Sequence, residues 1–232
     1  MTACGRERFG HPHAGDALFV ARADGSQPRA VSEGLDLGPS TFEMRSAWSP
    51  DSRRIAFTAF SAGRHHLYVA NADGSAREEI GASDISRVDP AWSPDGQWIA
   101  FQQGGTDKDA HRALYLIRPD GTGEHRVATS VGGSFAYRHA EWLPDAGRQV
   151  LAYPVGKSSA YNIGTLDVAT GTETLVSAEP AAELSPVWSP DGTLLAWKES
   201  DAVVRIARSD GTIVRRIPAI LDYDFVWSPN GA

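Results

Sequence analysis

The sequence predicts an all-β protein, a β-propeller of four-stranded antiparallel blades, and three observations support this fold class. A phrase of the type Trp-Ser-Pro-Asp-Gly recurs about every 40 to 50 residues, a period typical of repeat architectures. A second phrase, a short β-prone run followed by Asp-Gly or Thr-Gly, recurs between its copies. No segment shows the sustained apolar period of an amphipathic helix. The copies of the first phrase are marked by Trp48, Trp92, Trp142, Trp188 and Trp227.

The tryptophan phrase predicts the first hairpin of each repeat. It reads "AWSPDSRRIAF" at 47–57 and "AWSPDGQWIAF" at 91–101. Proline presets φ at the second position of a turn, aspartate accepts hydrogen bonds from nearby backbone, and glycine takes positive φ without steric cost. We therefore expect a strand A that ends at the tryptophan, a tight turn, and a strand B that follows it. Variants of the phrase occupy 141–153, 187–197 and 226–232.

The second phrase predicts the other hairpin, with strands C and D. It reads "LYVANADGSAREEI" from Leu67 and "LYLIRPDGTGEHRV" from Leu114, and Asp-Gly between two short strands is a strong hairpin signal. A sheet of four strands of about five residues each cannot bury both of its faces alone. Radial stacking of such sheets buries the faces, and closing the ring protects the edges. We therefore interpret residues 1–232 as a single propeller domain. Weaker copies begin at Leu18, Ile163 and Val204.

The number of blades depends on how the two ends of the chain are interpreted. The chain ends in a fifth tryptophan phrase, and the residues near Met1 align with the region around Ile55. In this interpretation Arg6–Phe9 supplies strand B of the N-terminal blade, and the C-terminal strand Asp224–Ser228 pairs into that blade. The result is a closed ring of five blades. The alternative is an open fragment of a six-bladed ring.

Composition and charge exclude several classes of protein. The net charge is −7 and 41% of the 232 residues are hydrophobic, so no basic surface indicates a nucleic-acid partner or anionic lipid. Cys4 is the single cysteine, which excludes an internal disulfide framework. No apolar run approaches the roughly 20 residues that a membrane-spanning helix needs. We expect a soluble monomer without membrane insertion.

The combined pattern "WSPDG…IAF…LYV…DG" resembles the PD-type, WD-like repeats of TolB-family β-propellers, and the resemblance covers nearly the whole chain. Related propellers precede the hydrolase domain of prolyl oligopeptidase-like enzymes. The motif is specific for the fold and uninformative about the task, because propellers host many functions. From the sequence alone we expect neither the export signal nor the α/β domain that accompany the TolB propeller. As written it predicts a cytoplasmic chain, or a periplasmic or extracellular one if it belongs to an exported TolB-like protein.

Polar residues just before each tryptophan are the candidate binding site. Strand A lies nearest the propeller axis, so we expect these side chains at the channel mouth, beside the irregular loops where function usually lies. A polar mouth would bind a peptide segment or a polar small molecule. The alternative is that these residues form ion pairs between blades or face water. Five residues before the tryptophans stand Glu43, Arg87, Tyr137, Glu183 and Asp222, and three before stand Arg45, Asp89, His139, Ser185 and Asp224.

The predicted function is a non-catalytic scaffold that binds a protein or peptide partner, as the TolB resemblance implies. We expect no catalytic residue, no metal and no cofactor. The alternative is an enzyme, either a metal-dependent lyase or hydrolase or the detached propeller of a peptidase. That alternative would recruit histidines from different blades, because three imidazoles can hold a metal. The histidines that it would draw on are His65, His66, His111 and His139.

Two other patterns are assigned structural or adventitious roles. The His-x-His pair at His11 and His13 has only Asp16 nearby as a further ligand, fewer than a metal site needs. The repeated aspartates of the tryptophan phrase occupy turn positions in separate blades, so a turn role is preferred over a catalytic one. These aspartates are Asp51, Asp95, Asp145 and Asp191.

Overall fold

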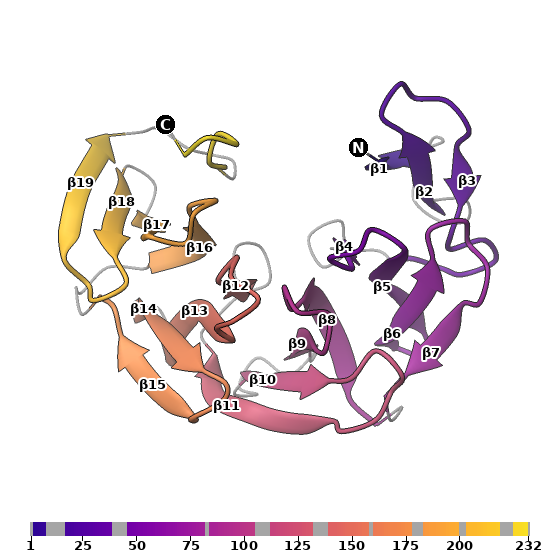
Figure 1. Cartoon of the computed structure of the whole chain (residues 1–232). Coiled ribbons are helices and arrows are strands. Elements are labelled where there is room, and N and C mark those ends of the chain that lie inside the picture. Colours follow the sequence, from indigo (N-terminus) through magenta and orange to yellow (C-terminus); the bar gives the residue numbers. More distant parts are fainter. Residues whose placement is uncertain are drawn as a thin grey trace. The chain divides into compact units, whose positions relative to one another are not determined.

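The structure is a computed structural model in which every described regular element is a β-strand, as the sequence predicts (Figure 1). The chain divides by its internal contacts into two compact units. The first comprises Met1–Trp92, Gly96–Lys108 and Tyr115–His125, and the second Ser93–Asp95, Asp109–Leu114 and Arg126–Ala232. The structure describes residues 2–7, 17–38, 46–81, 84–104, 112–131, 139–157, 160–177, 183–199, 203–218 and 225–231.

The first unit begins with a three-stranded antiparallel sheet in the order β1-β2-β3. Its first strand runs over Thr2–Glu7 and pairs with Ala17–Arg22, whereas the sequence alignment placed this strand at Arg6–Phe9. The alignment assumed the short connection found in the second blade, but a longer connection here moves the strand toward the N-terminus. The strands are β1 (Thr2–Glu7), β2 (Ala17–Arg22) and β3 (Arg29–Ala30).

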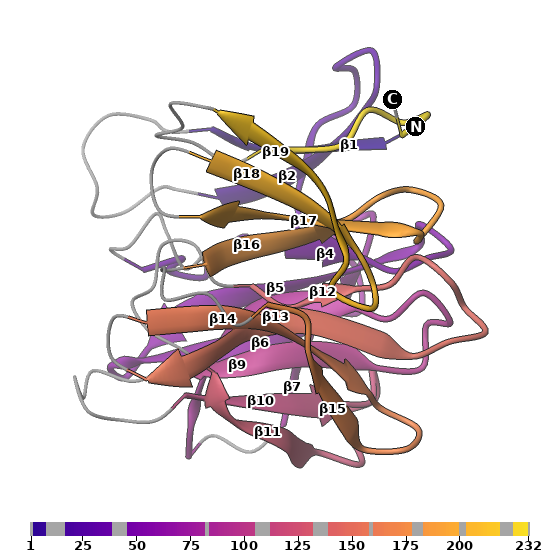
Figure 2. The ribbon, with the colours of Figure 1, turned by 90° about the vertical axis from the view of Figure 1, so that its left-hand side faces the viewer.

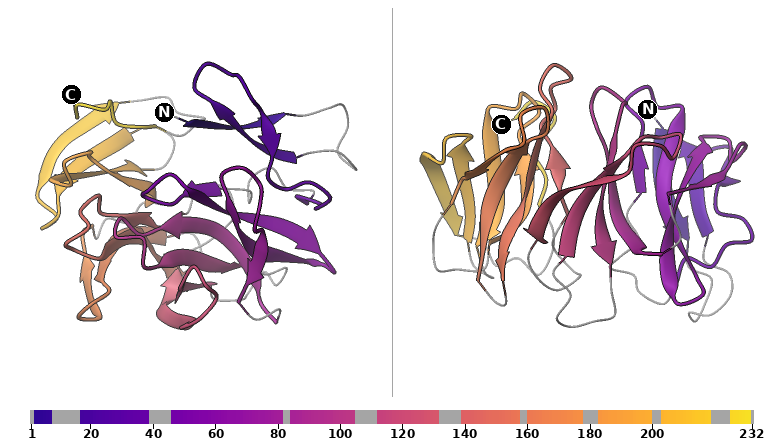
Figure 3. Two further views of the ribbon diagram at one scale, coloured as in Figure 1. Left: turned by 45° about the vertical axis from the view of Figure 1, so that its right-hand side comes forward. Right: turned by 90° about the horizontal axis from the view of Figure 1, so that it is seen from below.

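The second blade has the predicted four strands in the order β4-β5-β6-β7. In Figure 3 its purple strands stack beside the indigo strands of the first blade. Val20 and Val31 from the first blade pack there with Ile55 and Phe57 of the second. The strands are β4 (Ser46–Trp48), β5 (Arg54–Ser61), β6 (Arg64–Asn71) and β7 (Glu78–Ile80).

The Ser-Pro-Asp turn between β4 and β5 is closed by its own side chains. Ser49 Oγ donates a hydrogen bond to Asp51 Oδ1 at 2.6 Å and accepts one from the Arg54 N–H at 2.9 Å. The bond from Ser49 holds the pKa of the Asp51 carboxyl below its ordinary value. The turn role predicted for Asp51, Asp95, Asp145 and Asp191 is confirmed. The same bond recurs from Ser93 to Asp95, from Ser189 to Asp191 and from Ser228 to Asn230.

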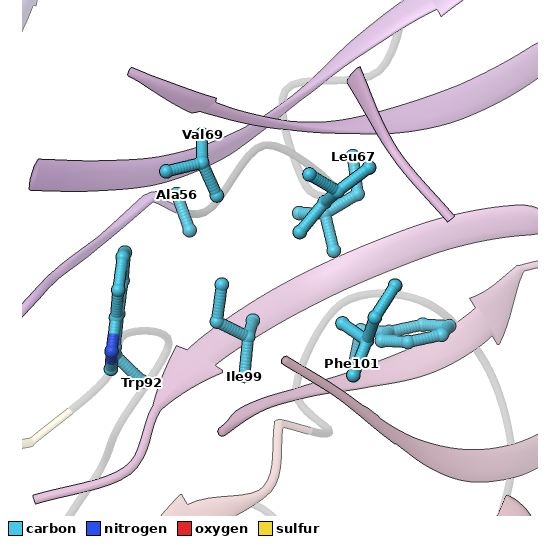
Figure 4. Close-up of a cluster of buried hydrophobic side chains, with 8 residues drawn as sticks. Ala56, Leu67, Val69, Trp92, Ile99 and Phe101 are labelled. Atoms are coloured by element: carbon cyan, nitrogen blue, oxygen red, sulfur yellow. The ribbon is translucent and has the colours of Figure 1, made fainter. Parts of the chain in front are cut away.

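The third blade follows with the strand order β8-β9-β10-β11, and the boundary between the two units passes through it. Strand β8 carries Trp92, which packs in the core of the first unit against Ala56, Val69 and Ile99 (Figure 4). Trp142 and Trp188 are buried in the same way, so in these three repeats the tryptophan has a packing role. The strands are β8 (Ser86–Trp92), β9 (Ile99–Gly104), β10 (Arg112–Ile117) and β11 (His125–Val131).

The fourth blade lies in the second unit. Strand β11 forms one backbone pair with it, Val131 opposite Val155 in β13, so the third and fourth blades share a continuous sheet. Separate sheets were expected. The strands are β12 (Glu141–Trp142), β13 (Val150–Lys157), β14 (Ala160–Asp167) and β15 (Thr172–Leu175).

The fifth blade is a four-stranded sheet in the order β16-β17-β18-β19 (Figure 2). Trp188 and Trp197 of this blade pack with Ala152 and Ile163 of the fourth. Residues 225–231 follow without a strand, and Trp227 Nε1 donates to the Val187 carbonyl at 3.0 Å. The strand expected over Asp224–Ser228 is absent from its described part, residues 225–228, and Asp224 lies outside the described residues. Pairing of this segment into the N-terminal blade stays a prediction. The strands are β16 (Glu183–Trp188), β17 (Leu194–Glu199), β18 (Val203–Arg208) and β19 (Ile213–Pro218).

Candidate functional site at the strand-A starts

The term strand-A starts denotes the residues that stand five and three positions before each repeat tryptophan. The described members are Arg87 and Asp89 in the first unit and His139, Glu183 and Ser185 in the second, and all five are buried. The remaining members that the sequence proposed, Glu43, Arg45, Tyr137, Asp222 and Asp224, lie outside the described residues.

The backbone at the strand-A starts is bulged in the same way in two blades. Asp89 and Ser185 stand at the same repeat position, with φ of 53° and 54°. At each, the register of the first hairpin shifts. A non-glycine residue with positive φ is uncommon, and a following proline restricts the residue further. A bulge re-aims side chains, and such strained backbone gathers at functional sites.

Arg87 is held in place by contacts inside the first unit. Its side chain is 1% exposed, and one terminal nitrogen, Nη2, donates to both carboxylate oxygens of Glu124 at 2.9 Å. Nη1 donates to the Ile85 carbonyl at 3.1 Å, and the guanidinium carbon lies 5.4 Å from the centre of the Phe101 ring. A Cβ added to Gly81 would lie 2.8 Å from Arg87 Nε. This guanidinium is therefore an internal anchor of the blade packing.

Glu183 occupies the equivalent position in the second unit and is fully buried. Ser177 Oγ donates to Glu183 Oε2 and accepts the Ile163 N–H at 2.9 Å. Burial raises the pKa of the Glu183 carboxyl to about 7, although the Trp197 side chain and, to a smaller extent, the positive charge of Arg205 act in the opposite direction. Arg205 is committed elsewhere, because it donates from Nε to Glu199 Oε2 and from Nη2 to Glu199 Oε1 at 2.7 Å.

The comparison with known families rests on this fold. A family model described as "TolB beta propeller domain" matches residues 10–232. The chain belongs to this family. The resemblance drawn from the repeated phrases is thereby confirmed.

Relatives of this TolB-family propeller agree with that assignment. A protein named TolB homolog from Chlorobium luteolum is 28% identical over 131 residues, which cover 56% of this chain and 28% of the relative. The chain thus spans about a quarter of that protein's length. A solved structure assigned to TolB from Agrobacterium tumefaciens is similar with a TM-score of 0.64 and 18% identity, over 93% of this chain and 80% of that one.

The same fold occurs in an enzyme. The structure of an oligogalacturonate lyase in complex with manganese is similar with a TM-score of 0.60 and 17% identity, over 86% of this chain and 58% of that one. An identity this low establishes the shared fold alone.

The TolB-family propeller has no gathered metal ligands within the ranges that the structure describes. His66 Nδ1 lies 2.8 Å from Glu79 Oε1, and the ring of His65 lies 5.1 Å from that of Phe60. His139 is buried in the other unit. None of the described segments forms a helix that could cross a membrane. The other proposed ligands, His11, His13, Asp16 and His111, lie outside the described residues.

Sequence reasoning missed the partners of the strand-A starts. Glu124 follows an Asp-Gly turn 37 residues after Arg87, and Ser177 lies in an irregular connection, so neither carries a local signal. The bulge did leave a signal. Asp-Pro precedes Ala-Trp at 89–92, and Ser-Pro precedes Val-Trp at 185–188, and a proline inside a strand marks a bulge or an edge.

Proposed function

We propose that this TolB-family propeller is a non-catalytic scaffold that binds a protein or peptide partner, with Asp89 of the first unit and Ser185 of the second as two separate candidate contact points. The shared bulge at Asp89 and Ser185 is the observation that supports it. Two separate blades have the same strained backbone at this position, and in each the strained residue carries a buried polar side chain. Strain of this kind costs about 1–3 kcal/mol per residue and persists where the surrounding structure holds it.

The charge of the chain indicates the chemistry of the partner. A net charge of −7 favours a partner with complementary positive groups, through faster association and orientation more than through affinity. Asp89 adds a carboxylate at the bulge of the first unit, but it is buried and already has an interaction within the protein, so the sign of the partner's charge is inferred from the net charge. The proposed partner is therefore a protein segment with lysine or arginine side chains.

Selection from random peptides tests the proposal, because it requires no candidate partner. Immobilised full-length chain is offered a phage-displayed library of random peptides, and a selected peptide is titrated calorimetrically against Asp89→Asn and Ser185→Ala. We expect the substitution in the unit that binds the selected peptide to weaken binding about tenfold. Asp120→Asn removes a charge from an exposed turn of the first unit and should leave the affinity unchanged.

Two outcomes would contradict the proposal. Undiminished affinity in both variants, with circular dichroism unchanged, would remove the strand-A starts from consideration. Failure to select any peptide would remove the scaffold function itself.

A further inference from the structure

A cavity of about 330 Å³ lies between the fourth and fifth blades, inside the second unit. It opens at the end of the blades where the tight turns lie, away from the strand-A starts. Its lining includes Thr165, Asp167, Thr172 and Thr174 from β14 and β15, together with Arg148 and Trp188. Its volume is at the lower end of the range of small-molecule sites, about 300–1,000 Å³.

The four polar residues from β14 and β15 form two neighbouring cross-strand pairs. Thr165 pairs with Thr174 and Asp167 pairs with Thr172 across the two strands. Side chains two residues apart on a strand point to the same face. The hydroxyl groups and the carboxylate therefore converge on the same side of the sheet, toward the fifth blade.

The equivalent place in the first unit has a valine and is covered by an arginine side chain. Counting backbone pairings from the strand-A tryptophan puts Thr165 where the second blade has Val69. Val69 packs in the core against Trp92 of the next blade, and the Arg54 guanidinium lies 5.0 Å from the Trp92 ring centre. The pairings that establish this equivalence are Trp142–Leu151–Leu166 and Trp48–Ile55–Ala70.

In the second unit a hydroxyl replaces this valine beside the corresponding tryptophan. Thr165 is only 8% exposed and Trp188 only 5%. Among the described residues, Trp188 Nε1 is buried without a hydrogen-bond partner, as is Trp92 Nε1 at the equivalent place, but only Trp188 lines the cavity described above. A buried polar group without a partner costs about 1–3 kcal/mol. A ligand that supplies hydrogen bonds would offset that cost.

The charges of the cavity favour a neutral ligand. Arg148 and Asp167 carry opposite signs, and each already has a partner. Arg148 Nε donates to Asp145 Oδ2 at 3.1 Å, and Asp167 Oδ1 accepts the Thr170 N–H at 2.9 Å. The remaining chemistry is that of hydroxyl groups beside an indole ring, which suits a ligand with an apolar face and several hydroxyl groups.

We propose that this cavity binds a neutral polyol of the size of a single sugar ring. The threonine hydroxyls would both donate and accept hydrogen bonds to the hydroxyl groups of the ring, and Trp188 would contact its apolar side. This site is independent of the proposed scaffold function, because it involves none of the strand-A starts.

Ligand-observed saturation-transfer NMR on the full chain tests the proposal, with D-glucose, D-galactose, D-mannose and myo-inositol as probes and D-glucuronate as the charged comparison. We expect transfer to at least one neutral probe. Thr165→Val installs the residue of the equivalent position at nearly constant volume, and should weaken binding about tenfold. Thr212→Val, in an exposed turn of the same unit, should leave binding unchanged. Denaturation midpoints of both variants establish that they fold.

Three results would overturn the proposal. One is the absence of transfer to every neutral probe. The second is transfer that survives undiminished in both Thr165→Val and Thr174→Val. The third is stronger transfer to D-glucuronate than to every neutral probe, which would contradict the neutral ligand class.

Discussion

Arg87 in the first unit and Glu183 in the second stand at the same place in the repeat, five residues before the tryptophan, and both are buried. Their electrostatic surroundings differ. Arg87 is matched by a full carboxylate, that of Glu124, whereas Glu183 is contacted by the Ser177 hydroxyl and lies beside an arginine already paired with Glu199. The repeat therefore determines that the position is buried, and residues from irregular segments determine which charge state is stable there.

The largest effect is expected from removal of the buried cation. Arg87→Ala should lower the free energy of unfolding by about 3–5 kcal/mol, because it leaves the Glu124 carboxylate without its partner. Urea denaturation measures it. The exposed pair of Arg148 and Asp145 supplies the control, since Arg148→Ala should cost less than about 1 kcal/mol. Arg87→Ala/Glu124→Ala should be less destabilised than Arg87→Ala, and equal costs would contradict a coupled pair.

A smaller, pH-dependent effect is expected at Glu183. The pKa of Glu183 is about 7 in the folded state and 4.5 ordinarily. Between these two pH values the folded chain therefore keeps a proton that the unfolded chain has lost. The free energy of unfolding therefore falls by on the order of 3 kcal/mol as the pH rises from about 4.5 through 7. Glu183→Gln carries no charge and should lack this loss.

Urea midpoints at pH 5 and pH 8 test this difference. The variant should be distinctly more stable than the wild type at pH 8, and nearly equal to it at pH 5. The same pH dependence in wild type and variant would show that Glu183 does not titrate as described.

The smallest effect concerns the bulges two residues further on. Glycine takes positive φ freely and alanine does not. Ser185→Gly should therefore be more stable than Ser185→Ala by about 1 kcal/mol, and Asp89→Gly should exceed Asp89→Ala by a similar amount. Thermal denaturation compares the four variants. A glycine advantage in one unit alone would mean that the two bulges are not equivalent.

The fold could be predicted from the sequence because its information is local. Each Ser-Pro-Asp turn closes through its own serine and aspartate, as at Ser49 and Asp51, so the phrase specifies a hairpin without reference to the rest of the chain. The first strand was misplaced at Arg6–Phe9 instead of Thr2–Glu7 because the length of an irregular connection has no such rule.

The candidate site could be predicted only in part. The repeat position identified Arg87 and Glu183 as unusual polar residues on strand A, but their partners come from segments with no periodic signal. The cavity beside Trp188 was not predicted at all. Its lining has Thr165 and Val150 where the first unit has Val69 and Arg54, and that equivalence becomes visible only when strand pairings are counted.

The proton on Glu183 also has a consequence for calorimetry. Near pH 6 unfolding transfers that proton to the solvent, so the buffer takes it up and contributes its own heat of ionisation. The measured enthalpy of unfolding will therefore depend on the choice of buffer, although the contacts of the folded protein are the same in every buffer. A series of buffers at one pH counts the released protons directly, and thereby reports on a side chain that no solvent reaches.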